Sequence, residues 1–268
     1  MTTDVRSITP WALIAGGSEG VGACFARRLA DQGINLFLIA RKPGPLEELA
    51  TEIRGKGVEV RTLQLDLTAP DAIDKVKAAT DGLEIGMLIH NAGSIATFGE
   101  FVDLPLEIST DSVMINVISQ MQFAHHFGKL MKARGKGFIV MLGSMAGNAG
   151  CAMTAAYAGA KACSQIFSEG FWFEMRPHGV HVLSLVIGGT NTPALIRNIG
   201  EAREGMADPD DVAKEGLDHL LDGPVWVASG YGGAAHHIRK LPRVDAVTMM
   251  SEASAPLFKA QIAARAAG

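Results

Sequence analysis

Short apolar segments alternate with amphipathic segments along most of the chain. Several of the apolar runs are hydrophobic at every position, which is typical of strands buried in a parallel sheet that helices cover on both sides. The predicted strands are residues 11–15, 35–40, 58–65, 85–90, 137–142, 180–186 and 225–228.

The amphipathic segments between these runs predict helices. Two of them begin with favourable chemistry, because Pro70 comes shortly after Thr68 and Pro209 directly follows Asp208. The regular alternation of strand and helix predicts an α/β fold, with a Rossmann-like, doubly wound parallel sheet of about seven strands and helices on both faces. The predicted helices are residues 20–32, 44–55, 70–79, 112–133, 153–177 and 209–221.

No repeat, low-complexity segment or Pro/Gly/Ser-rich linker divides the 268 residues. We therefore expect one dinucleotide-binding domain over residues 1–268, a length that suits a single large core. Within it, residues 190–222 are expected to form a variable lid. Residues 229–268, which open with a glycine-rich turn and end in an Ala-rich amphipathic tail, are expected to form a C-terminal appendage.

Composition and charge exclude several classes of protein. Hydrophobic residues make up 48% of the chain and charged residues 19%, which is a globular composition, and the net charge is −4 with scattered Lys and Arg. No apolar run approaches the ~20 residues of a membrane span. The N-terminus lacks the apolar core of a signal peptide. We expect a cytoplasmic protein that binds neither nucleic acid nor membrane.

Cysteine and histidine offer no metal chemistry. The three cysteines are dispersed, so they predict neither a disulfide framework nor a metal site. The adjacent pairs His125-His126 and His236-His237 would diverge by about 100° on a helix, so neither pair is expected to share a metal ion.

A glycine-rich turn follows the first predicted strand and opens the first predicted helix. In this position Gly16 permits a tight turn, Gly20 lets the backbone approach a phosphate, and Gly22 allows close helix packing. The amides at the start of the helix would then face a pyrophosphate group. The alternative is a structural turn without a ligand. The predicted cofactor-binding residues here are Gly16, Ser18, Glu19, Gly20, Val21 and Gly22.

The end of the second predicted strand favours NADP(H) over NAD(H). An acidic residue at this point would bind the ribose diol of NAD, but the chain has Arg41 and Lys42 instead. Two cations suit the 2′-phosphate of NADP. A solvated basic turn is the alternative.

Two further strand ends carry candidate cofactor contacts. Asp66, with Leu67, follows the third strand and could meet the adenine edge. Asn91, Ala92 and Gly93 follow the fourth strand and would bring backbone close to the cofactor. Each signal is weak alone, because aspartates at strand ends are usually caps, but their order along successive strands is informative.

Tyr157 and Lys161 form a Tyr-x-x-x-Lys pair, thirteen residues after Ser144. Four residues on a helix bring both side chains to one face. A nearby ammonium favours the phenolate, so a phenol with a reference pKa of ~10 could exchange protons nearer neutrality. This is the chemistry that carbonyl reduction or alcohol oxidation requires.

Together these motifs resemble the short-chain dehydrogenase/reductase family in its shorter, single-domain form, over residues 10–228. The glycine turn is similar to the family's T-G-x-x-x-G-x-G turn, with Ala15 in place of threonine. His90 replaces the first residue of the family's Asn-Asn-Ala-Gly motif. Ile187 replaces the proline of a segment that covers nicotinamide in the family, in which Gly188, Thr190 and Thr192 are the candidate contacts. The chain lacks the family's common Val-Asp-Gly-Gly ending.

The resemblance implies catalytic roles for Asn116, Ser144, Tyr157 and Lys161, which match the family's tetrad in order and spacing. Ser144 would orient the substrate oxygen, and Tyr157, which is also a candidate cofactor contact, would donate or accept its proton. Lys161 would lower the pKa of Tyr157 and hold the nicotinamide ribose, and Asn116 would hold a water linking Lys161 to solvent. The family also implies a homodimer or homotetramer built on helices 112–133 and 153–177.

The predicted function is hydride transfer between NADP(H) and a hydrophobic ketone or secondary alcohol. The expected pocket lining is apolar, and Arg197, the nearby cation, is interpreted as part of a solvated helix face. One alternative is a catalytically silent NADP-binding regulatory protein on the same fold. A weaker one is a dehydratase or epimerase. The expected pocket residues are Ala146, Ala149, Cys151, Met153, Ala194, Leu195 and Ile196.

Overall fold

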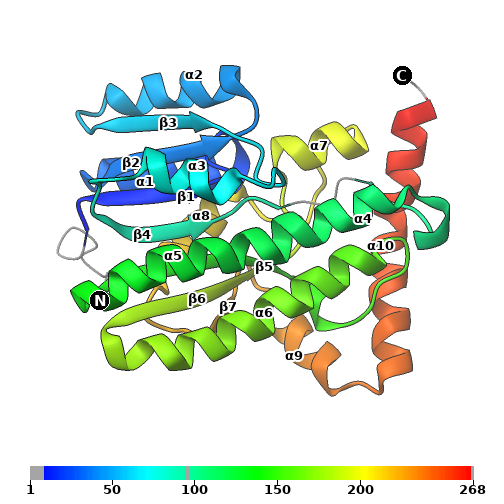
Figure 1. The fold of residues 1–268 in the computed structure, drawn as a ribbon. Coiled ribbons are helices and arrows are strands. Elements are labelled where there is room, and N and C mark those ends of the chain that lie inside the picture. The colour runs from blue at the N-terminus through cyan, green and yellow to red at the C-terminus, as the bar shows by residue number, and fades with distance from the viewer. Residues whose placement is uncertain (1–8, 94–96, 267–268) are drawn as a thin grey trace.

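All seven predicted strands lie in one parallel sheet, with the order β3-β2-β1-β4-β5-β6-β7 (Figure 1). The computed structural model describes residues 9–93 and 97–266. The predicted fold class is confirmed, and the strand order reverses between β1 and β4, where ligands bind in sheets of this kind. The strands are β1 (Trp11–Ala15), β2 (Asn35–Ala40), β3 (Val60–Gln64), β4 (Ile85–His90), β5 (Gly137–Ser144), β6 (Val180–Ile187) and β7 (Val225–Val227).

Helices cover both faces of this sheet and produce two separate hydrophobic cores. Alternation along β1 shows the division: Ala12 and Ile14 pack with α1, α2 and α8, whereas Leu13 and Ala15 pack with α3, α5 and α6. The helices of these two layers are α1 (Gly20–Asp31), α2 (Pro43–Arg54), α3 (Ala72–Ala79), α5 (Ser119–Arg134), α6 (Ala155–Met175) and α8 (Pro209–Asp218).

The helix predicted over 112–133 begins earlier and is not uniform. It starts as α4 (Leu106–Val113), continues through a π-helical turn, η3 (Met114–Ile118), and then becomes α5. A π-helical turn adds one residue to the repeat, so it re-aims the side chains that it carries. Asn116 lies within this turn.

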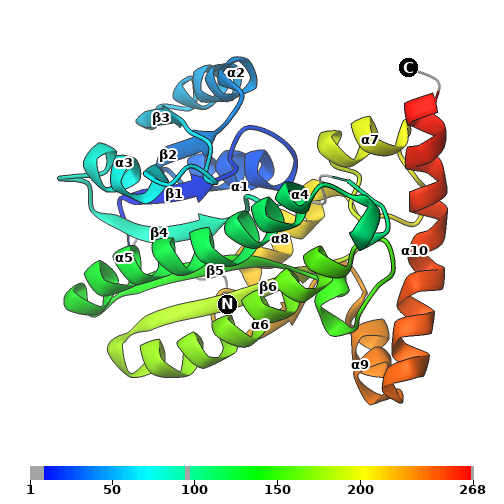
Figure 2. The same ribbon diagram turned by 45° about the vertical axis from the view of Figure 1, so that its right-hand side comes forward.

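Three helices that the sequence analysis did not delimit lie at the carboxyl edge of the sheet: α7 (Pro193–Ile199), α9 (Gly232–Lys240) and α10 (Arg243–Ala266). Figures 1 and 2 show α10 standing across this edge beside α7. Met250 and Phe258 of α10 pack with Phe98 and Cys151 in a third apolar cluster. The C-terminal segment therefore covers loops that surround the strand ends.

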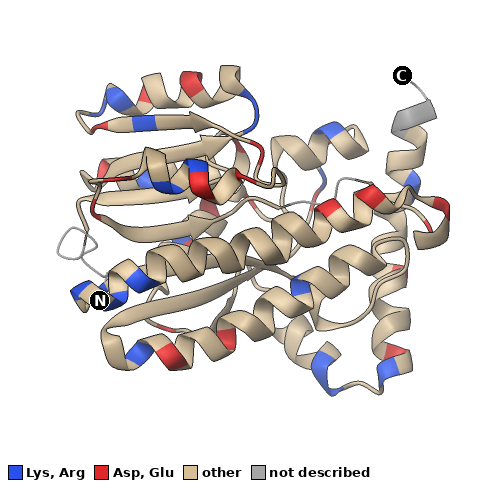
Figure 3. Cartoon of the chain, in the orientation of Figure 1, with Lys and Arg blue, Asp and Glu red and all other residues tan. Residues whose placement is uncertain are grey.

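Charged residues of both signs are interspersed along the helices (Figure 3). Among the described residues, no helix is both long and apolar enough to cross a bilayer. Residues 1–8, on which the expectation about a signal peptide depends, lie outside the described part of the chain.

Candidate active site

The glycine turn is hydrogen-bonded to β2 on one side of β1 and to the loop after β4 on the other. The amides of Gly16 and Gly17 donate to the Ile39 carbonyl at 2.8 and 3.1 Å, and Asn91 Nδ2 donates to the Gly16 carbonyl at 2.8 Å. Gly16 has φ +81°, and a Cβ there would lie 2.8 Å from the Ala92 amide nitrogen. A side chain at this position would therefore force β1 and the loop after β4 apart.

The start of α1 has the donor chemistry of a phosphate site. Glu19 is the N-cap residue, but its side chain makes no capping hydrogen bond to this helix. The first amides of a helix have no intrahelical acceptors, so the amides of Gly20, Val21 and Gly22 can donate to an anion. Ser18 adds a hydroxyl in the turn just before them. These groups fit the pyrophosphate of a dinucleotide.

The loop after β4 lies against both the glycine turn and the π-helical turn. The amides of Asn91 and Ala92 both donate to the Ala15 carbonyl, at 3.0 and 2.7 Å. Gly93 packs directly on the Asn116 side chain. The loop thus links the predicted cofactor turn to the predicted catalytic asparagine.

The four predicted catalytic residues come from three elements. Ser144 ends β5, Tyr157 and Lys161 share one face of α6, and Asn116 lies in η3. Lys161 Nζ lies 5.7 Å from the centroid of the Tyr157 ring. A side-chain hydrogen bond joins Ser144, at the end of β5, to Tyr157 on α6.

Lys161 is 2% exposed and donates from Nζ to the Leu142 carbonyl at 2.7 Å. Burial lowers the pKa of its ammonium to about 7. Withdrawal from solvent also raises the pKa of the Tyr157 phenol, and the hydrogen bond with Ser144 opposes this increase. The expected lowering of the Tyr157 pKa by Lys161 is therefore not what this structure shows, because burial disfavours both charges.

Asn116 is completely buried, and its Nδ2 donates to the Ser112 carbonyl at 2.9 Å. Its Oδ1 is buried and has no hydrogen-bond partner within the described residues. Such an acceptor calls for a water or a ligand hydroxyl, since a buried polar atom without a partner costs about 1–3 kcal/mol. This observation fits the predicted role of Asn116.

The predicted adenine-side residues follow β2 and β3. Arg41 and Lys42 are exposed directly after β2. Asp66 Oδ1 accepts from the Thr68 amide at 3.0 Å and from its hydroxyl at 2.8 Å, so it caps the turn after β3. Leu67 is buried and supports that turn from inside.

The segment after β6 lies over the glycine turn. Thr192 caps α7 by accepting from the Leu195 amide at 3.2 Å, and its Cγ2 would be 3.1 Å from a Cβ on Gly20. Thr190 forms a bridge with Ala207, which closes the loop that contains α7.

Tyr231 is a contact that the sequence analysis did not identify. Its ring lies directly on Gly188, and its hydroxyl donates to the Gly189 carbonyl at 3.4 Å. The ring thus supports the segment in which Ile187 replaces proline. The glycines around Tyr231 mark a turn in the sequence, but nothing local indicates its partner.

A small cavity lies beside Tyr157, between α4 and the start of α6. Of the expected pocket residues, Met153 contributes to its lining, whereas Ala149 and Cys151 pack into the cluster that contains α10. The residues of the opposite wall were not predicted from the sequence. This wall is lined by Thr97, Gly99, Phe101, Leu104, Ile108, Ser109 and Ser112.

His90 occupies the position of the first asparagine in the Asn-Asn-Ala-Gly motif to which residues 90–93 are similar. Its side chain is completely buried, its Nε2 lies 2.9 Å from Ser119 Oγ, and its ring meets Phe123 edge-on. Burial, assisted by the charge of Lys161, lowers the pKa of His90 to about 3. The imidazole is therefore neutral at physiological pH.

Replacing His90 with asparagine is expected to make the protein less sensitive to acid. Below about pH 6.5 this histidine is protonated in the unfolded chain, whereas in the folded chain it stays neutral down to about pH 3. The unfolding free energy should therefore fall as pH decreases through this window, by up to ~1.4 kcal/mol per pH unit for one proton.

Urea unfolding of the wild type and His90→Asn at pH 5, 6 and 7 measures this dependence. Other buried histidines contribute equally to both proteins, so the difference in slope reports His90. Substituting the exposed His236 with asparagine is the control and should leave the slope unchanged. Equal slopes for the wild type and His90→Asn would contradict the assignment.

Comparison with known proteins places these features in a wider context. The sequence model of a family described as short chain dehydrogenase matches residues 10–202. The 7beta-hydroxysteroid dehydrogenase of Mediterraneibacter gnavus is 30% identical over an alignment of 217 residues that covers 78% of this chain and 82% of that protein.

Solved structures show the same similarity in three dimensions. A structure reported in a study of 7beta-hydroxysteroid dehydrogenase stereoselectivity matches with a TM-score of 0.86 and 27% identity, covering 92% of this chain and 99% of that one. A short-chain dehydrogenase from Sphingobium yanoikuyae in complex with NADPH matches with a TM-score of 0.77 and 30% identity, covering 85% and 91%.

Proposed function

This chain belongs to the short-chain dehydrogenase/reductase family of oxidoreductases, and we propose that it transfers a hydride between NADP(H) and a hydrophobic ketone or secondary alcohol. The observation that carries the proposal is the convergence of Ser144, Tyr157 and Lys161 beside the loop that anchors the glycine turn. A proton-transfer group and a phosphate-binding turn are thereby held at one edge of the sheet.

The chain's own residues would hold the cofactor and move the proton. Amides at the start of α1 would bind the pyrophosphate, and Lys161 would bind the nicotinamide ribose. Bound NADP(H) supplies a hydride for reduction or accepts one in oxidation.

During reduction, Tyr157 would donate its phenolic proton to the carbonyl oxygen while Ser144 donates a hydrogen bond to the same oxygen. A raised Tyr157 pKa keeps this proton available at neutral pH. Lys161 would stabilise the phenolate that forms, and the unpaired Asn116 Oδ1 would hold a water through which the proton is replaced.

The substrate is expected to be bulky and apolar. The cavity beside Tyr157 is lined by Phe101, Leu104, Ile108 and Met153. Its volume of ≈ 30 Å³ suits a reacting group rather than a whole molecule. The rest of the substrate would extend toward the cluster covered by α10. The similarity to 7beta-hydroxysteroid dehydrogenases supports a polycyclic alcohol or ketone as the first substrate to test.

A homo-oligomer belongs to the same proposal. Ile166 and Phe173 are 66% and 62% exposed, and their spacing on α6 puts both on one face of the helix. A second copy of this chain would cover them.

The proposed preference for NADP(H) rests on Arg41 and Lys42. The Arg41→Ala variant should weaken NADPH binding roughly tenfold or more, because a charge-assisted contact with the 2′-phosphate is lost, and should change NADH binding little. Fluorescence titration of both cofactors measures the two dissociation constants. Arg54→Ala, at the far end of α2, is the control. Equal weakening of NADPH and NADH would contradict the assignment.

The proposed function is tested by following NADPH oxidation with a panel of ketosteroids, bulky alicyclic ketones and small polar ketones, and NADP reduction with the corresponding alcohols. Turnover with the apolar compounds and little with the polar ones is the expected result. Tight NADPH binding without turnover of any compound would instead favour a silent regulatory protein.

A further inference from the structure

An ion pair joins the glycine turn to the lid. Arg197 Nη1 lies 2.9 Å from Glu19 Oε2, and Arg197 Nη2 lies 2.5 Å from Glu19 Oε1. Glu19 is the residue before α1, and Arg197 is in the last turn of α7. The guanidinium therefore binds both carboxylate oxygens across a separation of 178 residues.

The pair lies beside the expected phosphate positions. Thr192, at the other end of α7, lies over Gly20 in the same turn. The hydrogen bond from Arg197, followed by the charges of Arg197 and Lys42, lowers the pKa of Glu19. Glu19 thus lies within the field of Lys42, which with Arg41 forms the cation pair assigned to the 2′-phosphate.

A carboxylate at this point is unfavourable for an anionic ligand. It repels the pyrophosphate of either dinucleotide, and it repels NADP(H) more strongly because of the additional charge of the 2′-phosphate. The two cations after β2 attract that phosphate, so an ionised and unpaired Glu19 would work against them. The bidentate Arg197 removes this conflict by neutralising Glu19.

We propose that Arg197 determines cofactor specificity by holding Glu19, so that the lid helix α7 must be docked on the glycine turn for NADP(H) to be preferred over NAD(H). This inference rests on the proposed use of NADP(H) and adds a residue outside the cation pair. It also explains why an acidic residue is tolerated in a turn that binds phosphate.

A purely structural tether is the competing explanation. The Arg197 and Glu19 side chains are 49% and 30% exposed, and ion pairs of such exposure contribute little to stability. Their charge acts on any anion bound next to them, however. The two explanations therefore predict different results for ligands that differ only in a phosphate.

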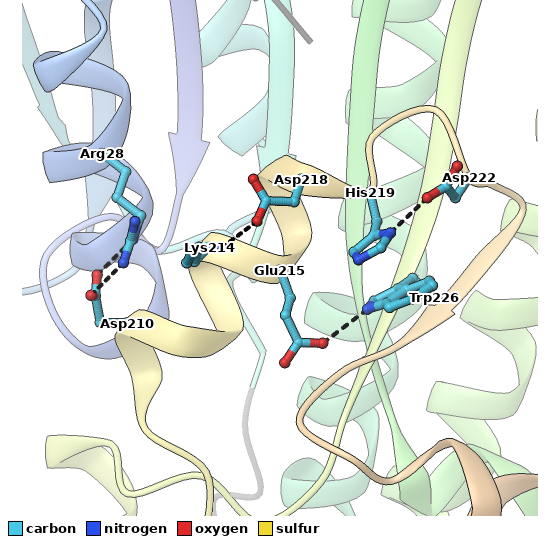
Figure 4. A network of polar contacts seen from close by, with 8 residues as sticks. All are labelled: Arg28, Asp210, Lys214, Glu215, Asp218, His219, Asp222 and Trp226. Atoms are coloured by element: carbon cyan, nitrogen blue, oxygen red, sulfur yellow. Dashed lines mark hydrogen bonds and ion pairs between the residues drawn. The ribbon is translucent and has the colours of Figure 1, made fainter. Parts of the chain in front are cut away.

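The chain provides a matched control. Arg28 binds both oxygens of Asp210, with distances of 2.8 and 2.5 Å, and joins α1 to α8 (Figure 4). This pair has the same chemistry and also connects distant segments, but it lies at the other end of α1. A tether lost here should affect stability alone.

The experiment measures dissociation constants by calorimetry, for NADPH and NADH and for the fragments 2′,5′-ADP and 5′-AMP. The proteins are the wild type, Arg197→Gln, Glu19→Gln, the double variant and Arg28→Gln. In Arg197→Gln the preference for NADPH over NADH, and for 2′,5′-ADP over 5′-AMP, should fall about fivefold. The Glu19 carboxylate is then no longer neutralised, and it repels the 2′-phosphate across solvent. Glu19→Gln should retain or increase the preference, and the double variant should restore it to within about twofold of the wild type.

Four results would decide the matter. An unchanged preference in Arg197→Gln, with a normal wild-type preference and the expected loss in Arg41→Ala, would overturn the role of Arg197 alone. A similar loss of preference in Arg28→Gln, or failure of the double variant to recover, would also overturn it. A wild type without preference for 2′,5′-ADP would reject the proposed use of NADP(H), and the role of Arg197 with it.

Discussion

The Tyr157→Phe variant is expected to lower kcat for ketone reduction by about 10²–10⁴-fold, the usual contribution of a positioned general acid. The substitution removes the hydroxyl and keeps the ring, so packing on α6 and the approach of Lys161 Nζ to the ring should persist. Because the cofactor turn is built from β1 and α1, NADPH binding should change by less than about threefold, well below the effect on turnover. Single-turnover kinetics together with a fluorescence titration measure the two quantities.

Ser144→Ala supplies the comparison for this variant. Ser144 hydrogen-bonds with Tyr157 and opposes the increase of its pKa. Its loss should reduce kcat less than Tyr157→Phe does, because Ser144→Ala removes a hydrogen bond to the substrate oxygen but leaves the proton donor in place. Normal turnover of Tyr157→Phe would contradict the proposed chemistry, and an equal loss of cofactor binding would point to a structural effect.

The sheet could be predicted from the sequence because its strands are buried on both faces. The four residues Leu36–Ile39, for example, have almost no exposed surface, so every position along the strand must be apolar. The predicted strand bounds therefore agree with the structure to within two residues. The same reasoning worked for α1, α2 and α6, whose apolar residues recur at helical spacing.

The helices that were not predicted from the sequence depend on capping and on tertiary contacts rather than on a local apolar pattern. The seven residues of α7 are too few to be stable alone, and they depend on the Thr192 cap and on contacts with the glycine turn. Pro256 interrupts the hydrogen bonding of α10, whose stability comes from packing over loops that are distant in the sequence. The π-helical turn around Asn116 likewise has no sequence signature.

In the candidate site, too, the residues with a local sequence pattern were predicted and the contacts between distant residues were not. Tyr157 and Lys161 were predicted because both lie on one helix, and the glycine turn because it follows a strand directly. The ion pair of Arg197 and the ring of Tyr231 could not be predicted, since each depends on a contact with a residue far away in the chain. Arg197 in particular is half exposed, as the sequence suggested, but it binds Glu19 rather than solvent alone.

Replacing Lys161 with methionine is expected to impair both turnover and cofactor binding. The thioether keeps most of the apolar stem and removes the ammonium, whose Nζ lies 5.7 Å from the centroid of the Tyr157 ring. We expect kcat to fall at least about 10²-fold, because the phenolate formed during reduction loses its stabilising charge. The dissociation constant for NADPH should rise as well, since a donor to the ribose is lost. Normal values for either quantity would contradict the dual role.

The pH dependence of the wild type identifies this ammonium directly. Because burial lowers the pKa of Lys161 to about 7, the charge is present below that pH and lost above it. The profile of kcat/KM for reduction reports the free enzyme, so it should decline above about pH 7. Lys161→Arg keeps the charge at all these pH values and should remove the decline while retaining partial activity. A decline that persists in Lys161→Arg would show that another group titrates.

The burial of Lys161 is also expected to lower the unfolding free energy at neutral pH. Between pH 7 and about 10.5 the unfolded chain binds a proton at Lys161 that the folded chain has released, so the unfolding free energy should rise with pH in this window. The slope for one group is ~1.4 kcal/mol per pH unit and should be absent from Lys161→Met. Urea unfolding of both proteins at pH 7, 8 and 9 tests this. A catalytic lysine would thus lower stability at neutral pH, which is expected where a charge is kept in an apolar site for chemistry rather than for folding.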